Sequence, residues 1–126
     1  MTARCLKLIE LFGIKNCNTV KKALDWLVLN NIDINFIDVK KDLTSEHLNQ
    51  WFQNLPSDLN PLMFVNQRGI TWRNLADSDK QLINSTKGII ELILQKPSVM
   101  KRPVLVNNKK VVLLGYDEEK YQKEFA

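Results

Sequence analysis

The first 39 residues change their hydrophobic period twice, and this change limits the folds that the chain can adopt. A short apolar run ends near Phe12 and is closed by Gly13, as is typical of a buried strand. Apolar residues then recur at helical spacing as far as Asn30, and a second apolar run extends from Ile32 to Val39. We therefore expect a β-α-β unit, which closes right-handed with two parallel strands.

The rest of the chain predicts a helical block followed by a hairpin and a last helix. Helical spacing dominates from about 43 to 96. Asn107-Asn108 separates two β-branched runs and predicts an antiparallel hairpin, and Asp117 starts the final helix. This order matches one α/β domain over residues 1–126, a thioredoxin-like fold with a mixed four-stranded sheet and a helical insertion at about 43–96.

Short polar side chains mark the expected starts of two helices. Asn18 or Thr19 can cap the first helix, and Ser45 can cap the first helix of the insertion. A side-chain oxygen at these places satisfies an amide that the helix itself leaves unpaired. We expect both helices to begin near these residues.

Composition and charge exclude several classes of protein. Hydrophobic residues make up 44% of the 126 residues and charged residues 25%, which is typical of a folded domain with its own core. No apolar run is long enough to cross a bilayer, and no separate signal sequence is seen. The net charge of +4 is spread along the chain without a dense basic patch, so nucleic acid is not expected as a partner. We expect a cytoplasmic monomer.

The strongest candidate for chemistry is Cys17, which lies between the first strand and the first turn of the helix. Unpaired amides and the positive end of the helix meet there, and both lower the pKa of a thiol, as do cations such as Lys15. The structural alternative is a small buried side chain without reactivity. The reactive interpretation is the one that the position favours.

A second thiol for Cys17 must come from outside the chain. Asn18, Thr19 and Val20 follow it, so the CxxC pair of dithiol oxidoreductases is absent. Cys5 precedes an extended strand that would hold the two sulfurs ~20 Å or more apart, because a strand rises about 3.3 Å per residue. Glutathione or a thiol on a partner protein is the expected supplier.

Three segments, LFGIKNCNTVKKALDWL, NQRGITWRNL and KPSVMKRPVL, occur in an order and spacing that resemble the arsenate reductase (ArsC) superfamily. Within it the likeness is greatest to the small YffB-type proteins, whose relatives include the Spx regulators. The resemblance spans about residues 7 to 122 and implies a thioredoxin fold with a helical insertion. It also implies a glutathione-dependent thiol reductase.

The resemblance assigns roles to individual residues. Cys17 becomes the nucleophile, Arg102 the anion-binding arginine, and Pro103 the proline of the thioredoxin fold, expected in the cis form. The residues expected to bind anionic groups or glutathione are Lys15, Asn16, Asn18, Thr19, Arg68, Arg102 and Pro103. No bound cofactor or metal is expected, and glutathione acts as a thiol co-substrate. A glutaredoxin or a disulfide-containing protein is a further candidate partner.

Other functions of the superfamily stay open as alternatives. One is arsenate reduction linked to glutathione or glutaredoxin, but the family's second and third arginines align with Asn66 and Gly115, which removes cationic partners for an oxyanion. Another is a regulator that resembles Spx and binds RNA polymerase, and a third is a scaffold with an inert cysteine. His47, the single histidine, is expected on a solvated helix face.

Overall fold

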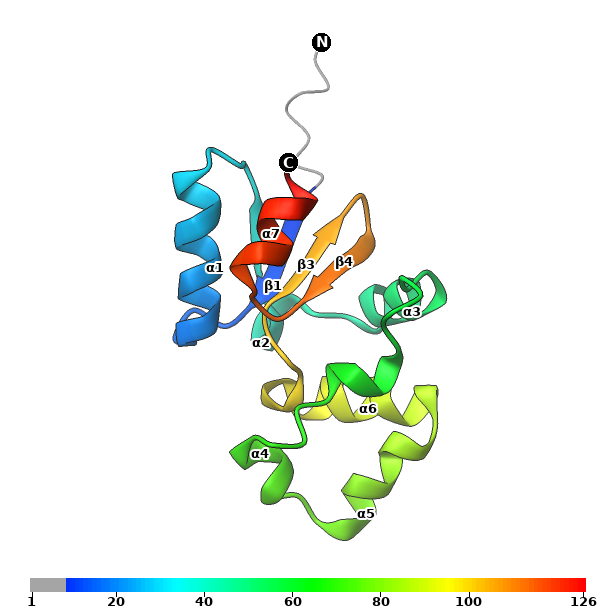
Figure 1. Ribbon diagram of the computed structural model, residues 1–126. Coiled ribbons are helices and arrows are strands. Elements are labelled where there is room, and N and C mark those ends of the chain that lie inside the picture. The colour runs from blue at the N-terminus through cyan, green and yellow to red at the C-terminus, as the bar shows by residue number, and fades with distance from the viewer. Residues whose placement is uncertain (1–8) are drawn as a thin grey trace.

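The computed structural model describes residues 9–126, and a four-stranded sheet forms its centre (Figure 1). The strands are β1 (Ile9–Gly13), β2 (Asn35–Asp38), β3 (Val104–Asn107) and β4 (Lys110–Leu114), in the order β2-β1-β3-β4. Strand β1 is parallel to β2 and antiparallel to β3, and β3 is antiparallel to β4. The predicted mixed sheet is therefore confirmed. Cys5 and the start of the first predicted strand lie outside the described residues.

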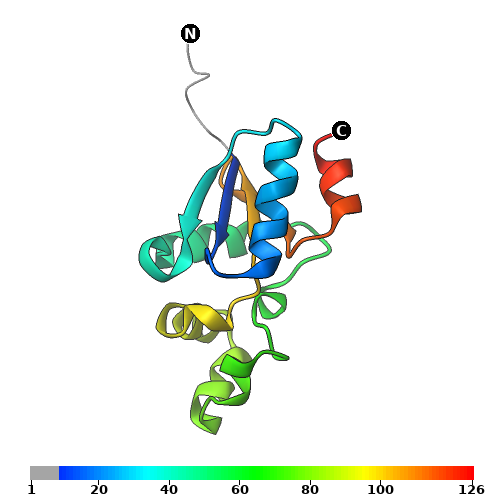
Figure 2. The same ribbon diagram turned by 90° about the vertical axis from the view of Figure 1, so that its left-hand side faces the viewer.

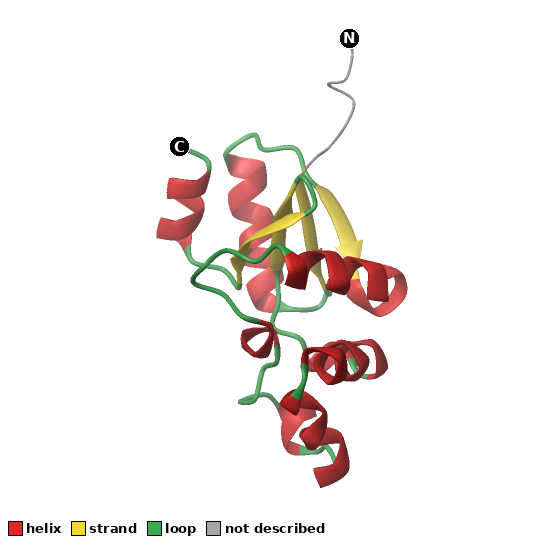
Figure 3. Ribbon diagram, turned by 90° about the vertical axis from the view of Figure 1, so that its right-hand side faces the viewer, coloured by secondary structure: helices red, strands yellow, loops and turns green. Residues whose placement is uncertain are grey.

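Helices cover the two faces of the sheet in different ways. Helices α1 (Asn18–Leu29) and α7 (Glu118–Glu124) lie on one face, and Figure 2 shows both on the same side of the strands. Helices α2 (Val39–Asp42) and α3 (Ser45–Gln53) lie on the opposite side, as Figure 3 shows. The remaining elements extend beyond one end of the sheet: η2 (Pro61–Phe64), α4 (Ile70–Arg73), α5 (Asp77–Lys80), η3 (Gln81–Asn84), α6 (Thr86–Gln95) and η4 (Pro97–Val99).

Alternation along the strands divides the core into two clusters. Leu11 and Leu105 pack with α1 and α7, where Val20, Leu27 and Tyr121 are fully buried. Their neighbours in the strands turn the other way, toward the insertion, because successive side chains of a strand point to opposite faces. This second cluster includes Phe12, Val104, Trp51, Phe64, Ile93 and Met100. One sheet thus supports a small core on the α1 side and a larger one under the insertion.

Aromatic contacts fasten the insertion to the sheet. The Trp51 ring meets the Phe12 ring edge-on, with centroids 4.6 Å apart, and lies 6.2 Å from the Phe64 ring. Trp51 and Leu48 are the buried residues of α3, as expected from their helical spacing. Phe12 comes from β1, one residue from the turn that leads to Cys17. The insertion therefore packs directly behind the end of the strand that carries the candidate site.

Several element boundaries differ from the sequence expectations. Strand β2 begins at Asn35 rather than Ile32, and Val39 already belongs to α2 because the Asp38 carboxylate accepts a hydrogen bond from the Lys40 amide and starts a helical turn. The hairpin turn is formed by Asn108 and Lys109, with φ angles of 53° and 67°, so it lies one residue later than expected. The final helix begins after Asp117, as expected.

His47 also differs from its expected surface role. Its ring is half-buried and meets the Phe12 ring edge-on, with centroids 5.0 Å apart. Its Nδ1 atom accepts a hydrogen bond from the Thr44 amide at 3.1 Å, while the His47 amide donates to the Thr44 hydroxyl at 3.3 Å. This reciprocal pair is a capping box at the start of α3. Ser45, the expected cap, is the first residue inside the helix.

Residues 9–126 contain neither a membrane-spanning helix nor a metal-ligating cluster. No helix among them is long and apolar enough to cross a bilayer. No group of three or more His, Cys, Asp and Glu side chains in this part of the chain is placed to hold a metal ion.

Candidate functional site

Cys17 closes the turn between β1 and α1. Its amide donates to the Ile14 carbonyl at 3.2 Å, and its own carbonyl accepts from the Lys21 amide at 3.0 Å as the first bond of the helix. Gly13 allows the helix to pack close to the strand, because a Cβ at this position would lie 2.8 Å from a methyl carbon of Val20. The result is a free, partly exposed thiol at the N-cap of α1.

The surroundings of Cys17 favour its ionised form. Burial is the largest single influence and raises its pKa, but the Val20 amide, the Arg102 guanidinium and the Thr19 amide together outweigh it and lower the pKa below the usual value. The thiol itself forms no capping hydrogen bond. Amides at the start of the helix are therefore available to a sulfur anion, which accepts hydrogen bonds better than a neutral thiol does. The expected caps, Asn18 and Thr19, instead form the first turn of the helix.

Two backbone carbonyls hold the Arg102 guanidinium in place near the Cys17 sulfur. Its Nη1 atom donates to the Ser98 carbonyl and the Met100 carbonyl, both at 2.9 Å. Its Nε atom is buried and has no hydrogen-bond partner among residues 9–126. The peptide bond between Arg102 and Pro103 is cis, as expected. A fixed guanidinium with a donor to spare is suited to a thiolate or to a bound anion.

The insertion fixes the segment that carries Arg102. The Asn66 amide donates to the Val99 carbonyl at 2.8 Å, and the Lys101 amide donates to the Phe64 carbonyl at 2.7 Å. These bonds tie the residues before Arg102 to the end of η2 and the segment that follows it. Arg102 thus depends on the insertion for its position, whereas Cys17 depends on β1 and α1.

The structure brings together some of the predicted site residues and leaves others apart. The Arg102 guanidinium and the Thr19 amide both lower the pKa of Cys17, which places both of them near its sulfur. The predicted residues whose side chains are exposed are Lys15, Asn16, Asn18, Thr19 and Arg68. Arg68 lies in the loop after η2, where its amide donates to the Asn66 side chain at 3.2 Å. Among the cations in residues 9–126, Arg102 supplies the charge that lowers the pKa of Cys17.

Sequence reasoning missed the groups that orient Arg102. The carbonyls of Ser98 and Met100 accept its hydrogen bonds, and backbone carbonyls leave no trace in residue identity. The one available signal was Pro97, which favours the start of a short helical turn and so places these carbonyls at the end of the insertion.

Gly115 aligns with the third arginine of the arsenate reductases, and its backbone conformation is one that an arginine would rarely adopt. Its φ angle is +84°, a region that residues with a side chain rarely adopt. Its amide donates to the Pro103 carbonyl at 2.8 Å, which ties the end of β4 to the residue after Arg102. Gly115 thus offers no guanidinium at this position, and its part in the site is a backbone turn.

Comparison with known proteins agrees with this fold. The model of the ArsC family matches residues 12–124. A protein of uncharacterised function from Haemophilus influenzae is 37% identical over 120 residues, covering 94% of this chain and all of the relative. The regulatory protein MgsR of Bacillus subtilis is 25% identical over 111 residues, covering 86% of this chain and 83% of MgsR.

Among solved structures, a protein named YFFB is 33% identical with a TM-score of 0.82, covering 94% of this chain and 99% of that structure. The matched region includes Cys17, Arg102 and the whole helical insertion. By the extent of these matches, the chain belongs to the ArsC family.

Proposed function

We propose that this protein is a thiol-disulfide oxidoreductase that uses Cys17 as its single nucleophile and glutathione as its thiol co-substrate. The observation that carries the proposal is the meeting of Cys17, the first amides of α1 and the anchored Arg102 at one point. Thiolates, not thiols, attack disulfides, so a lowered pKa increases the reactive fraction at neutral pH.

The proposed reaction has two thiol-disulfide exchanges. The Cys17 thiolate attacks the glutathione sulfur of a mixed disulfide, and the substrate leaves as a thiolate with the electron pair of the broken bond. Cys17 is then joined to glutathione. A second glutathione thiolate attacks that sulfur, releases glutathione disulfide and restores the Cys17 thiolate. The net change converts one mixed disulfide and one glutathione into one free thiol and glutathione disulfide.

The other predicted residues surround this chemistry in supporting roles. Lys15 and Arg68 are proposed to attract the carboxylates of glutathione, and Asn16 and Asn18 to donate hydrogen bonds at the rim. The Thr19 and Val20 amides stabilise negative charge on the attacking or departing sulfur. Because no second cysteine stands at a CxxC position, the external thiol completes the cycle.

The first test replaces the nucleophile. Cys17→Ser should abolish the glutathione-dependent reduction of a mixed disulfide, because a serine hydroxyl is not ionised at neutral pH. Cys5→Ser is the matched control and should retain almost full activity. Equal loss of activity in the two variants would contradict the single-thiol scheme.

The second test removes the cation. Arg102→Gln should raise the pKa of Cys17 toward its usual value, since the guanidinium lowers it in the native protein. The rate of alkylation by the neutral reagent iodoacetamide, measured against pH, should shift to higher pH and fall several-fold at pH 7. Arg73→Gln, an exposed change in α4, should leave the profile in place. An unshifted profile for Arg102→Gln would remove Arg102 from the proposed mechanism.

Regulation of transcription is the second candidate, because MgsR of Bacillus subtilis is a regulatory protein and matches most of this chain. A regulator of this kind would bind RNA polymerase and need no turnover. Co-purification of polymerase subunits with both the native protein and Cys17→Ser, in the absence of reductase activity, would favour this candidate over the enzyme.

Arsenate reduction is not favoured by the site. The positions that align with further arginines of the arsenate reductases are Asn66 and Gly115, and neither offers a guanidinium. An oxyanion would therefore rely on Arg102 and on exposed residues such as Arg68. Strong activity in an assay coupled to arsenate, glutathione and glutaredoxin would reverse this order.

A further inference from the structure

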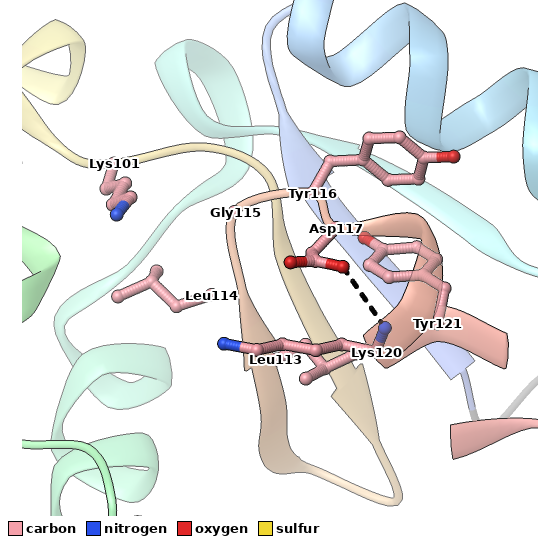
Figure 4. A pocket seen from close by; sticks show the side chains of 8 residues that line it. All are labelled: Lys101, Leu113, Leu114, Gly115, Tyr116, Asp117, Lys120 and Tyr121. Atoms are coloured by element: carbon pink, nitrogen blue, oxygen red, sulfur yellow. Dashed lines mark hydrogen bonds between the residues drawn. The ribbon is translucent and has the colours of Figure 1, made fainter. Parts of the chain in front are cut away.

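A cavity of about 200 Å³ lies at the end of β4, where the Gly115 amide is hydrogen-bonded to the Pro103 carbonyl. Figure 4 shows the side chains around it. The residues that line it are Lys101, Leu113, Leu114, Gly115, Tyr116, Asp117, Lys120 and Tyr121. A second cavity of about 200 Å³ shares Lys101, Leu113, Leu114 and Lys120 with the first. The two lysines therefore border a continuous groove along β4.

Tyr121 offers this cavity a hydrogen-bond donor without a partner. Its side chain is fully buried, and its hydroxyl has no hydrogen-bond partner among residues 9–126. Burial raises its pKa, with a smaller contribution from Tyr116, so the hydroxyl stays protonated. The ring is fixed by edge-on contacts with Tyr116, at 4.9 Å, and with Trp26, at 5.6 Å. A buried donor of this kind costs free energy until an acceptor reaches it.

The charges around the cavity favour an anion. Lys101 and Lys120 are exposed and contribute two ammonium groups, and in Figure 4 both side chains extend toward Leu114. Among residues 9–126, Asp117 lines the first cavity and Asp58 lines the second. The Asp117 carboxylate already caps α7 by accepting from the Glu119 and Lys120 amides at 3.0 and 3.3 Å. The first cavity thus offers two ammonium groups and a neutral hydroxyl, whereas its carboxylate already serves as a helix cap. Lysine ammonium groups and hydroxyls are suitable partners for a carboxylate ligand.

The cavity is connected to the Cys17 site through the backbone. Lys101 directly precedes Arg102, and Gly115 is hydrogen-bonded to Pro103. Cys17, Tyr116 and Tyr121 belong to the same packed cluster on the α1 side of the sheet. The cavity therefore borders the backbone that carries Arg102, the residue whose guanidinium acts on Cys17.

We propose that the cavity bordered by Lys101, Lys120 and Tyr121 binds a carboxylate of the thiol or disulfide that reacts at Cys17, and so selects acidic peptide thiols. This inference rests on the proposed oxidoreductase function. It extends that function by adding to Lys15 and Arg68 three residues, outside the reacting groups, that recognise a carboxylate of this substrate class.

The test compares glutathione disulfide with its tetraethyl ester, which keeps the same disulfide and peptide but lacks carboxylates. The quantity measured is the rate constant for formation of the Cys17-glutathione disulfide, with release of one glutathione thiolate. Lys101→Gln and Lys120→Gln should each slow the reaction with the acid several-fold and leave the reaction with the ester unchanged. Lys123→Gln, an exposed change on the same helix that does not border the cavity, is the matched control and should alter neither rate.

Tyr121→Phe separates binding from folding. The ring remains and the hydroxyl is lost, so the protein should be at least as stable as before, while the reaction with glutathione disulfide slows. An unchanged rate in Lys101→Gln, Lys120→Gln and Tyr121→Phe, or an equal loss with acid and ester, would overturn the carboxylate site. Failure of the unmodified protein to react with either disulfide would instead overturn the proposed function itself.

Discussion

At the start of α3 the Thr44 hydroxyl accepts a hydrogen bond from the His47 amide at 3.3 Å, and at the start of α6 the Ser85 hydroxyl accepts one from the Gly88 amide at 3.0 Å. At the start of α1 the equivalent position is Cys17, whose thiol accepts no such bond. Helices α3 and α6, the two longest of the insertion, are thus capped by side-chain oxygens, whereas the short α4 and α5 are not. The helix at the candidate site leaves its first amides for a sulfur anion.

This difference separates stability from function within one domain. Side-chain caps contribute about 1 kcal/mol each, because they satisfy amides that a helix leaves unpaired. The α1 terminus forgoes that contribution while its sulfur is protonated. Its amides lower the pKa of Cys17 instead, and they do so on the side of the sheet opposite the insertion that anchors Arg102. The site thus combines the N-terminus of α1, which has no side-chain cap, with Arg102, which backbone carbonyls at the end of the insertion hold in place.

The largest expected effect concerns the packing of the α6 N-terminus against η3. A Cβ on Gly88 would overlap the Leu82 carbonyl oxygen, so Gly88→Ala forces the start of α6 away from η3. Alanine normally stabilises a helix relative to glycine by about 1 kcal/mol. Here overpacking should instead reduce the free energy of unfolding by about 1–3 kcal/mol. Urea unfolding monitored by circular dichroism measures this change in the free energy of unfolding. A Gly88→Ala variant that is more stable than the native protein would show that the α6 N-terminus moves away from η3 without cost.

A smaller effect is expected from the cap of α3. Thr44→Ala should lower the free energy of unfolding by about 1 kcal/mol, because the His47 amide loses its acceptor. Ser45→Ala is the matched control, since Ser45 lies inside the first turn of α3 and is not the residue whose side chain accepts the capping hydrogen bond. It should change stability by no more than a few tenths of a kcal/mol. Equal losses in both variants would mean that the Thr44 bond contributes nothing specific.

The two candidate caps also show what sequence can and cannot predict. Thr44 and Ser45 both carry hydroxyls suited to capping, and the choice between them depends on backbone angles that residue types do not reveal. The change in hydrophobic period was sufficient to predict the β-α-β unit and the position of Cys17. Asp117 was also predicted to start α7, because no competing polar residue directly precedes it.

Contacts between distant segments were beyond sequence reasoning. Arg102 was identified through the family resemblance, but the two carbonyls that hold it depend on how the insertion closes. Lys101 and Lys120 are separated by the β3-β4 hairpin and meet at one cavity only because β4 returns antiparallel to β3. Such pairings follow from the folded topology, which no local pattern specifies.

The smallest expected effect examines the α1 terminus directly, through the stability of Cys17→Ser rather than its activity. Serine is a preferred cap, so at a pH below the lowered pKa of Cys17 the variant should be more stable than the native protein by up to about 1 kcal/mol. Because folding lowers the pKa of Cys17, the thiolate stabilises the native protein fully above the usual thiol pKa. That contribution is lost as the pH falls through the lowered pKa. The advantage of serine should therefore shrink between pH 5 and pH 9, as measured by urea unfolding at each pH. A constant difference across this range would mean that ionised sulfur gains nothing from the α1 amides.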